Sequence, residues 1–189
     1  MPPEEKYSRE KVAAAAFSLV RKHGISKLSA RNVARKLGSS IAPVYNHYSS
    51  MQELQAEVMV RARDLLHEYT TRPYSDMIFR NIGTGYIIFA REEPELFQAM
   101  FLERGAYRDQ LGITLNFFRE EMAKDTRLTP LNDEQKSDLL RTMKTFTHGL
   151  ATQIWAGIME ENSDEEIENA LIEVGAVMIE AALRECRGN

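Results

Sequence analysis

The chain has 189 residues, of which 43% are hydrophobic and 28% charged, and its formal net charge is −4. This is the composition of a globular protein, and no apolar run approaches the roughly 20 residues that a membrane-spanning helix needs. The first residues, MPPEEKYSRE, hold no apolar segment after a basic one, unlike a secretory signal, so we expect a cytoplasmic protein. Cys186 is the only cysteine, which excludes an internal disulfide and a cysteine-rich metal site.

Charge is unevenly distributed along the chain. Residues 1–50 hold nine lysine and arginine residues against three acidic ones, a net charge of +6, so the remaining 139 residues carry −10. A basic first quarter on an acidic body indicates that the front of the chain binds a polyanion while the rest has another task. A solvated helix that happens to be basic would give the same count, so charge alone leaves both interpretations open.

The first part of the chain shows the spacing of several short helices. Serines stand where N-caps are expected, and glycines stand where helices should end. Pro43 falls in the first turn of one of them, where a missing N–H is tolerated. The expected helices run from Ser8 to Gly24, from Ser29 to Gly38, from a cap at Ser40 to about Tyr48, and onward from Ser49 or Ser50. Two short helices joined by a glycine-containing turn and braced by a longer one predict a helix-turn-helix.

Beyond residue 70 the periodicity is helical throughout. We find no repeat and no convincing strand, so the predicted fold is all-α. The expected helices run from Ser75 to Arg91, from about Pro94 through Phe101, from Tyr107 to Lys124, from Asp133 to about Glu160 and from Asp164 to Arg184.

The third expected helix has two faces of different character. Val44 and Tyr48 share one face at spacing i, i+4 and are expected to be buried. The accessible set is Ala42, Pro43, Tyr45, Asn46 and His47. Such a set suits a major groove, because asparagine pairs with adenine, small apolar groups contact the thymine methyl, and tyrosine or histidine donates to phosphate.

Other interpretations of this helix stay open. Both tyrosines could belong to a core. An enzyme site is disfavoured, because His47 has no cysteine or carboxylate within one turn on its face to act as a metal co-ligand or to orient it. The alternative function from another class is a helical-bundle small-molecule-binding protein or enzyme with a basic N-terminal region.

From Ser8 to about Leu54 the chain resembles the DNA-binding domain of the tetracycline-repressor (TetR) family, through the segments AAFSLVRKHG, LSARNVARKLGSS and VYNHYSSMQEL. The resemblance implies a helix-turn-helix DNA-binding domain at 1–50 and a helical ligand-binding and dimerisation domain at 51–189. It also implies a cytoplasmic homodimer, and not an enzyme, that represses transcription until a small molecule releases it from a near-palindromic double-stranded DNA operator. The implied DNA contacts are Ser29, Arg31, Ser40, Ile41, Ala42, Pro43, Tyr45, Asn46 and His47.

One position departs from the family pattern. Members usually carry a lysine at the start of the fourth helix, where this chain has Met51. The amides of that helix start remain available for a phosphate in this interpretation. The basic residues that could compensate for the missing lysine are Lys6, Arg9, Lys27, Arg35 and Lys36.

The resemblance implies dimerisation through the last two helices, whose apolar stripes are wide and whose Gly149, Gly157 and Gly175 would allow close approach. The same stripes could instead fill a monomer core. Methionine and aromatic side chains are candidates to line a ligand pocket, although they too could be core. The pocket candidates are Phe79, Tyr86, Phe89, Phe97, Met100, Phe101, Tyr107, Phe118, Met122, Met143, Phe146 and Trp155. No cofactor, metal or membrane partner is predicted.

Overall fold

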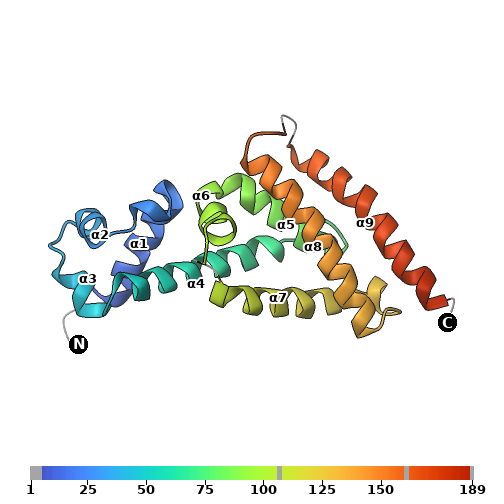
Figure 1. Cartoon of the computed structure of the whole chain (residues 1–189), viewed down its shortest axis with the longest axis horizontal. Helices are drawn as coiled ribbons and strands as arrows, with labels where there is room; N and C mark the ends of the chain where they lie inside the picture. Colours follow the sequence, from blue (N-terminus) through green and yellow to red (C-terminus); the bar gives the residue numbers. More distant parts are fainter. Residues whose placement is uncertain (1–5, 106–107, 160–161, 188–189) are drawn as a thin grey trace. The chain divides into compact units, whose positions relative to one another are not determined.

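The computed structural model describes residues 6–105, 108–159 and 162–187, and over these residues the chain is helical and contains no strand (Figure 1). The all-α prediction is confirmed. No described helix is both long and apolar enough to cross a membrane. The α-helices are α1 (Arg9–His23), α2 (Ala30–Leu37), α3 (Ala42–His47), α4 (Met51–Thr70), α5 (Ile78–Glu92), α6 (Pro94–Phe97), α7 (Arg108–Ala123), α8 (Asp133–Trp155) and α9 (Asp164–Arg187). Shorter turns are η1 (Ile25–Lys27), the π-helical η2 (Gln98–Leu102) and η3 (Thr126–Leu128).

The chain divides into two compact units. The first comprises Met1–Asp64 and Glu95–Gln110, and the second comprises Leu65–Pro94 and Leu111–Asn189. Helix α4 is continuous from Met51 to Thr70 and contributes to both units. The domain boundary expected after residue 50 therefore lies inside the first compact unit, at the start of this helix.

Helices α1 and α2 begin and end where the sequence predicts. The hydroxyl oxygens of Ser8 and Ser29 accept the amide N–H of the residue three positions later, both at 3.3 Å. Gly24 and Gly38 end the two helices with φ of +82° and +64°, values that favour glycine because it has no side chain. These two helices and α3 pack on one another within the first unit.

The N-terminus of α3 differs from the prediction. Ile41 is the N-cap, and the Ser40 hydroxyl accepts the Ala42 amide at a long 3.4 Å instead of capping the helix. The backbone amide of Val44 bonds to the carbonyl of Ile41, so the first turn of the helix closes on Ile41 and not on Ser40. Helix α4 starts as predicted, with the Ser50 hydroxyl accepting the Glu53 amide at 3.2 Å.

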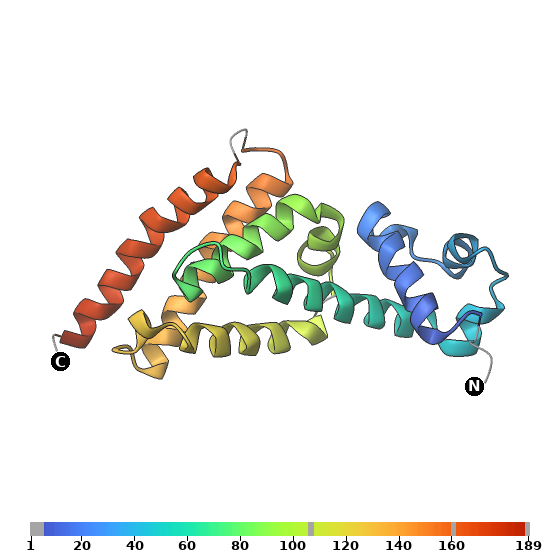
Figure 2. The ribbon, with the colours of Figure 1, turned by 180° about the vertical axis from the view of Figure 1, so that it is seen from behind.

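The second unit is built around α5, which packs against α8 and α9 (Figure 2). Nearly every residue from Phe79 to Ala90 is buried, as expected of a mostly apolar helix packed in the centre of the unit. It begins at Ile78 and not at Ser75, because Ser75 donates its amide and hydroxyl to the Asn81 side chain. The carboxylate of Asp125 accepts the Phe79 amide at 3.0 Å and satisfies the helix start from a distant loop.

Helix α8 ends earlier than predicted, at Trp155 instead of near Glu160, a residue outside the described ranges. Gly157 has φ +67°, and the amides of Gly157 and Ile158 bond to the carbonyls of Ile154 and Gln153, which is a Schellman ending. Gly157 is thus a helix terminator, and close approach at a dimer interface stays a prediction. A Cβ at Gly149 or Gly157 would meet nothing within 4 Å in the described chain.

Helix α9 follows and is attached at its start. The guanidinium of Arg91 on α5 donates to the carbonyl of Asn162 at 2.7 Å and to the carboxylate of Asp164 at 2.6 Å. Ile167 and Leu171 in its first half are buried.

Candidate nucleic-acid interface and ligand cavity

The two faces of α3 are separated as the sequence predicts. Val44 and Tyr48 are each 1% exposed, whereas Ile41 is 50% and Tyr45 is 52% exposed. The remaining members of the expected contact set are exposed or half-buried: Ala42, Asn46, Pro43 and His47. Two buried side chains therefore hold a short helix whose opposite side is open, and the tyrosines are divided between the two roles.

The exposed polar groups of α3 have no binding partner within the described chain. Neither the Tyr45 hydroxyl nor the Asn46 amide makes a hydrogen bond to another described residue. Arg31, early in α2, is likewise exposed and makes no hydrogen bond or ion pair there. Ser29 and Ser40 lie at the starts of α2 and α3, where their hydroxyls accept local backbone amides.

His47 is held within the first unit. Its Nε2 lies 2.6 Å from the carbonyl oxygen of Tyr7, and because a carbonyl only accepts, Nε2 carries the proton. The Tyr7 hydroxyl in turn donates to the carbonyl of Gly38, at 3.4 Å. The segment before α1 thus connects the end of α2 with the end of α3.

Arg9 joins three elements of the first unit, a role that the sequence analysis did not identify. Its Nη1 donates to the carbonyl of His47 at 2.7 Å, and its two Nη atoms lie 3.1–3.2 Å from the Glu53 carboxylate. Its guanidinium also stacks over the Tyr48 ring, 4.2 Å from the centroid. Arg9 therefore positions helix α3, and its guanidinium is engaged within the chain. A basic residue at the start of a helix carries no sequence signal for such long-range contacts.

The other basic residues named above lie elsewhere. Lys6 lies over the Tyr7 ring, 5.2 Å from its centroid. The remaining three, Lys27, Arg35 and Lys36, line a hollow of about 360 Å³ together with His23. This hollow lies between the end of α1 and helix α2, and it concentrates positive charge on the first unit.

The start of α4, where Met51 replaces the family lysine, is occupied by a carboxylate from the same chain. Glu53 accepts the Ser49 amide at 2.7 Å and the Ser49 hydroxyl at 2.8 Å. These bonds and the contact with Arg9 lower the pKa of Glu53, the Ser49 amide having the largest effect. The Ser49 amide is therefore bonded within the chain, and phosphate binding by the amides of the helix start itself stays a prediction.

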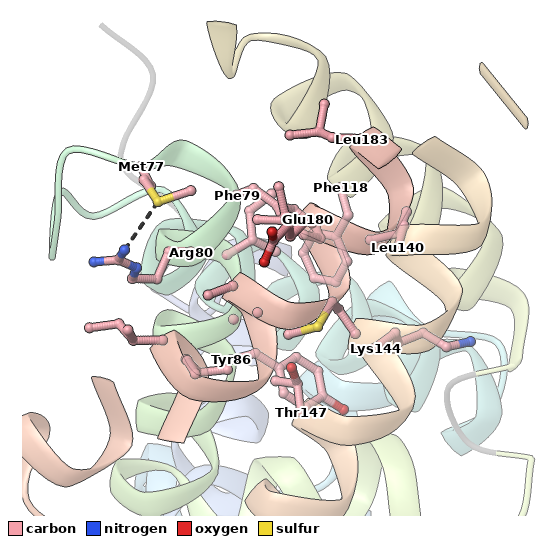
Figure 3. A pocket seen from close by; sticks show the side chains of 18 residues that line it. Met77, Phe79, Arg80, Tyr86, Phe118, Leu140, Lys144, Thr147, Glu180 and Leu183 are labelled. Atoms are coloured by element: carbon pink, nitrogen blue, oxygen red, sulfur yellow. Dashed lines mark hydrogen bonds between the residues drawn. The ribbon is translucent and has the colours of Figure 1, made fainter. Parts of the chain in front are cut away.

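A cavity of about 300 Å³ lies in the second unit between α5, α8 and α9, and is lined mainly by apolar side chains (Figure 3). Four of the twelve predicted pocket residues line it: Phe79, Tyr86, Phe118 and Met143. The sequence analysis missed most of the α9 wall, because that wall is aliphatic and only aromatic and methionine residues were considered. The α9 residues that line the cavity are Leu171, Ile172, Gly175, Ala176, Ile179, Glu180 and Leu183.

The other predicted pocket residues lie elsewhere. Phe97, Met100 and Phe101 belong to the first unit, where the first two are fully or almost fully buried. Phe89 and Met122 are buried in the core of the second unit and do not line the cavity. The two half-buried members of α8, Phe146 and Trp155, also lie outside the lining, and the Trp155 ring N–H donates to the carbonyl of Pro94 at 3.1 Å. Tyr107 lies outside the described residues.

One end of the cavity carries polar groups. Tyr86 and Thr147 lie at this end and Leu183 at the other, with Phe79 and Phe118 between them (Figure 3). The Tyr86 hydroxyl lies 3.0 Å from Nδ1 of His148. Burial, and then the positive charge of Lys144, lowers the pKa of His148 below its ordinary value of 6.5.

This lowered pKa predicts a pH dependence of stability. Since the fold favours neutral His148, its contribution is complete above pH 6.5 and is lost as the pH falls through the lower pKa of the folded chain. His148→Asn keeps an acceptor for Tyr86 but cannot take up a proton. We expect wild type to lose more unfolding free energy than His148→Asn between pH 7.5 and about 5.5. Urea unfolding at both pH values measures this, and parallel losses would contradict it.

Within the described parts of the chain, no three His, Cys, Asp or Glu side chains come together as metal ligands would. In the first unit, the exposed side of α3 presents neutral hydrogen-bond donors. In the second unit, the cavity has the hydrogen-bonded pair Tyr86 and His148 at one end. The first suits contact with another molecule's surface, and the second suits enclosure of a small apolar molecule.

Comparison with known proteins agrees with this division. Residues 12–58 match the family described as bacterial regulatory proteins, tetR family. The uncharacterized HTH-type transcriptional regulator YobS of Bacillus subtilis (strain 168) is 23% identical over 107 residues, which are 54% of this chain and 56% of YobS. The match therefore spans little more than half the length of that curated relative.

Solved structures share the fold over nearly the whole chain. A tetR-family transcriptional regulator from Streptomyces coelicolor superposes with a TM-score of 0.73 at 14% identity, over 100% of this chain and 90% of that one. The multidrug binding protein EbrR, complexed with imidazole, gives a TM-score of 0.63 at 16% identity, over 89% and 91%. The helix-turn-helix in the first unit lies in the segment that matches the tetR family of bacterial regulatory proteins, and the helical fold of the whole chain is shared with solved structures.

Proposed function

We propose that this protein is a ligand-responsive, DNA-binding transcriptional regulator, and specifically a repressor released from a near-palindromic operator by a small molecule. The observation that carries the proposal is the open face of α3. Val44 and Tyr48 hold this helix in place, while Ile41, Tyr45 and Asn46 stay exposed on the basic part of the chain. The charge of the contact surface comes from neighbouring helices, and base recognition comes from shape, methyl contacts and neutral hydrogen bonds.

A two-fold dimer would present two such helices to successive major grooves, about 34–36 Å apart. The support for dimerisation is the unburied apolar surface of α9. Beyond Gly175 no side chain of known burial in this helix is buried, and Val177 is 65% exposed. A second copy covering this surface forms a symmetric interface. A chain that light scattering finds monomeric at concentrations where operator binding saturates contradicts this part of the proposal.

The cavity of the second unit is the proposed effector site, and the ligand-bound relative EbrR supports a small-molecule role for this part of the fold. The two recognition helices have a different spacing in the conformation that the ligand prefers. Because the ligand binds that conformation more tightly than the DNA-binding one, it lowers the affinity of the protein for DNA. The alternative class, a helical-bundle binding protein or enzyme with a basic front, predicts DNA binding that is absent or insensitive to salt.

The salt dependence of DNA binding tests the proposal. With a duplex enriched from a random-sequence pool, the logarithm of the affinity should fall linearly with the logarithm of salt concentration, by about 0.9 per neutralised phosphate. Tyr45→Ala should weaken binding about tenfold, because it removes a surface donor. The melting temperature should stay unchanged, since the side chain is half exposed and unbonded. Unchanged affinity in fluorescence anisotropy would contradict the role of Tyr45.

Met51→Lys is expected to strengthen DNA binding about threefold at low salt and to steepen the salt slope by about one phosphate. The substitution restores a cation at the start of α4, where Glu53 at present holds the local amide. Asn116→Lys adds the same charge on an exposed position of α7 in the second unit and serves as the control. Equal slopes for the two variants would show that the start of α4 does not contact the phosphates.

A further inference from the structure

The charged residues that line the α5–α8–α9 cavity are exposed or half-buried; we call this charged part of the lining the mouth, and its charges are not balanced. Arg80 on α5, Lys144 on α8 and Glu180 on α9 are the charged residues of the lining. Glu180 is neutralised by its neighbour one turn later, Arg184, at 2.5 Å. No described carboxylate lies within 4 Å of the Arg80 guanidinium or the Lys144 ammonium. The mouth therefore has two uncompensated positive charges.

Arg80 and Lys144 also have unused hydrogen-bonding capacity. The one hydrogen bond of Arg80 within the described chain runs from Nη2 to the sulfur of Met77, at 3.1 Å, and thioether sulfur is a weak acceptor. Lys144 makes no hydrogen bond to any described residue. The two side chains lie on opposite sides of the cavity with their charged ends directed outward (Figure 3). Both have long, flexible stems, which allow either one to turn toward a ligand.

The interior between these charges is apolar. Phe79, Phe118, Leu140, Met143 and Leu171 contribute carbon and sulfur atoms, and the polar groups among the lining residues inside the mouth are the hydroxyls of Tyr86 and Thr147. No lining carboxylate lies deeper in the cavity to bind a cation, since Glu180 is at the exposed mouth and already paired. A ligand with an apolar body and a charged end matches this distribution of apolar and charged side chains.

We propose that the cavity binds an amphipathic carboxylate, with its hydrocarbon part inside and its carboxylate at the mouth beside Arg80 or Lys144. This inference rests on the proposed function and names the chemical class of its effector. A cationic amphiphile of the same size meets two like charges at the mouth and is disfavoured, and a neutral one gains the apolar burial alone.

Three probes with the same ten-carbon chain separate these cases: decanoate, decanol and decyltrimethylammonium. Each is titrated calorimetrically into the full-length chain without DNA, below the concentration at which it forms micelles. Decanoate should bind at least about tenfold more tightly than decanol, and decyltrimethylammonium should bind most weakly. The inference is wrong if decyltrimethylammonium binds as tightly as decanoate, or if none of the three binds.

Variants locate the binding and guard against misfolding. Arg80→Gln and Lys144→Gln together should remove the preference for decanoate and leave the decanol affinity unchanged, so decanol reports that the cavity is intact. Gly175→Leu fills the cavity, because a Cβ there meets only the Met143 methyl, at 3.8 Å, and should abolish binding of all three probes. Gly112→Leu makes the same exchange in open space on α7 and should change nothing.

Measuring DNA binding with the same protein preparations tests the regulator function separately from the effector class. If decanoate shows no preference while DNA binding keeps its salt dependence, the effector class is wrong and the regulator stands. If decanoate binds as expected and DNA binding is absent, the proposed function fails and the cavity assignment stands. Probe binding that Gly175→Leu leaves intact places the ligand elsewhere and overturns the inference.

Discussion

Gly85→Ala is expected to lower the free energy of unfolding of the second unit by about 3 kcal/mol. Gly85 lies in the middle of α5, where the last turn of α4 crosses it. A Cβ at this position would lie 2.2 Å from the carbonyl oxygen of Tyr69 and 2.7 Å from Cα of Thr70. Both neighbours are backbone, so no side chain can rotate away and the helices must separate. This loss exceeds the gain of about 1 kcal/mol that alanine brings to a helix interior.

The crossing is also held by side chains, so separation of the helices has a further effect. The Tyr69 hydroxyl donates to the carboxylate of Glu92 at 2.8 Å, and its ring packs edge-on against Phe89 at 5.5 Å. Burial, followed by the Glu92 carboxylate, raises the pKa of Tyr69 to about 12, so the hydroxyl remains a donor at neutral pH. Displacing α4 breaks this bond.

The fluorescence of Trp155 during urea unfolding measures this prediction, because Trp155 is the only tryptophan and belongs to the second unit. Gly112→Ala is the matched control. Its Cβ meets nothing within 4 Å, so it should stabilise the same unit by about 0.5–1 kcal/mol through helix propensity alone. If Gly85→Ala were as stable as Gly112→Ala, the close crossing would be wrong.

Arg9→Ala is expected to destabilise the first unit by about 2 kcal/mol and to weaken operator binding about tenfold. The substitution removes the donor to the His47 carbonyl at the end of α3, the partner of Glu53 and the group stacked on Tyr48. It leaves the Glu53 carboxylate without its cation. Helix α3 then loses a fixed orientation, so affinity falls although Arg9 itself is engaged within the chain.

Lys22→Ala tests this interpretation, because it removes one positive charge from the last turn of the same helix, at an exposed position that makes no hydrogen bond or ion pair with another described residue. Thermal unfolding by circular dichroism and anisotropy with the enriched duplex measure the two effects. We expect Lys22→Ala to retain the wild-type melting temperature. Equal losses of stability and affinity in both variants would mean that Arg9 acts only through its charge.

The helix-turn-helix could be predicted from the sequence because the residues that determine it act on neighbouring positions of the chain. Ser8, Ser29, Gly24 and Gly38 act through their own backbone positions, and the spacing of Val44 and Tyr48 alone determines which side of α3 is buried. The N-cap of α3, which is Ile41 and not Ser40, and the end of α8 at Trp155 were misplaced by one and by several residues. At the end of α8 the turn at Gly157 decided the boundary, and at α3 the first backbone bond to Ile41 did.

The cavity was only partly predictable. Aromatic and methionine content indicated Phe79, Tyr86, Phe118 and Met143, yet the same residue types at Phe89 and Met122 are core. Which of them faces empty space depends on how α5, α8 and α9 pack, and helical spacing does not contain that information. The aliphatic wall of α9 has the composition of any buried stripe.

By itself the sequence determined the helical class, the position of the helix-turn-helix and the open face of α3, because capping, glycine turns and i, i+4 spacing act within one or two turns of chain. Only the tertiary structure decided that Arg9 and Glu53 fix α3, that Gly85 admits the crossing of α4, and that Arg80 and Lys144 stand uncompensated at one cavity. Each of these depends on side chains or backbone far apart in sequence, whose meeting follows from packing and not from local pattern.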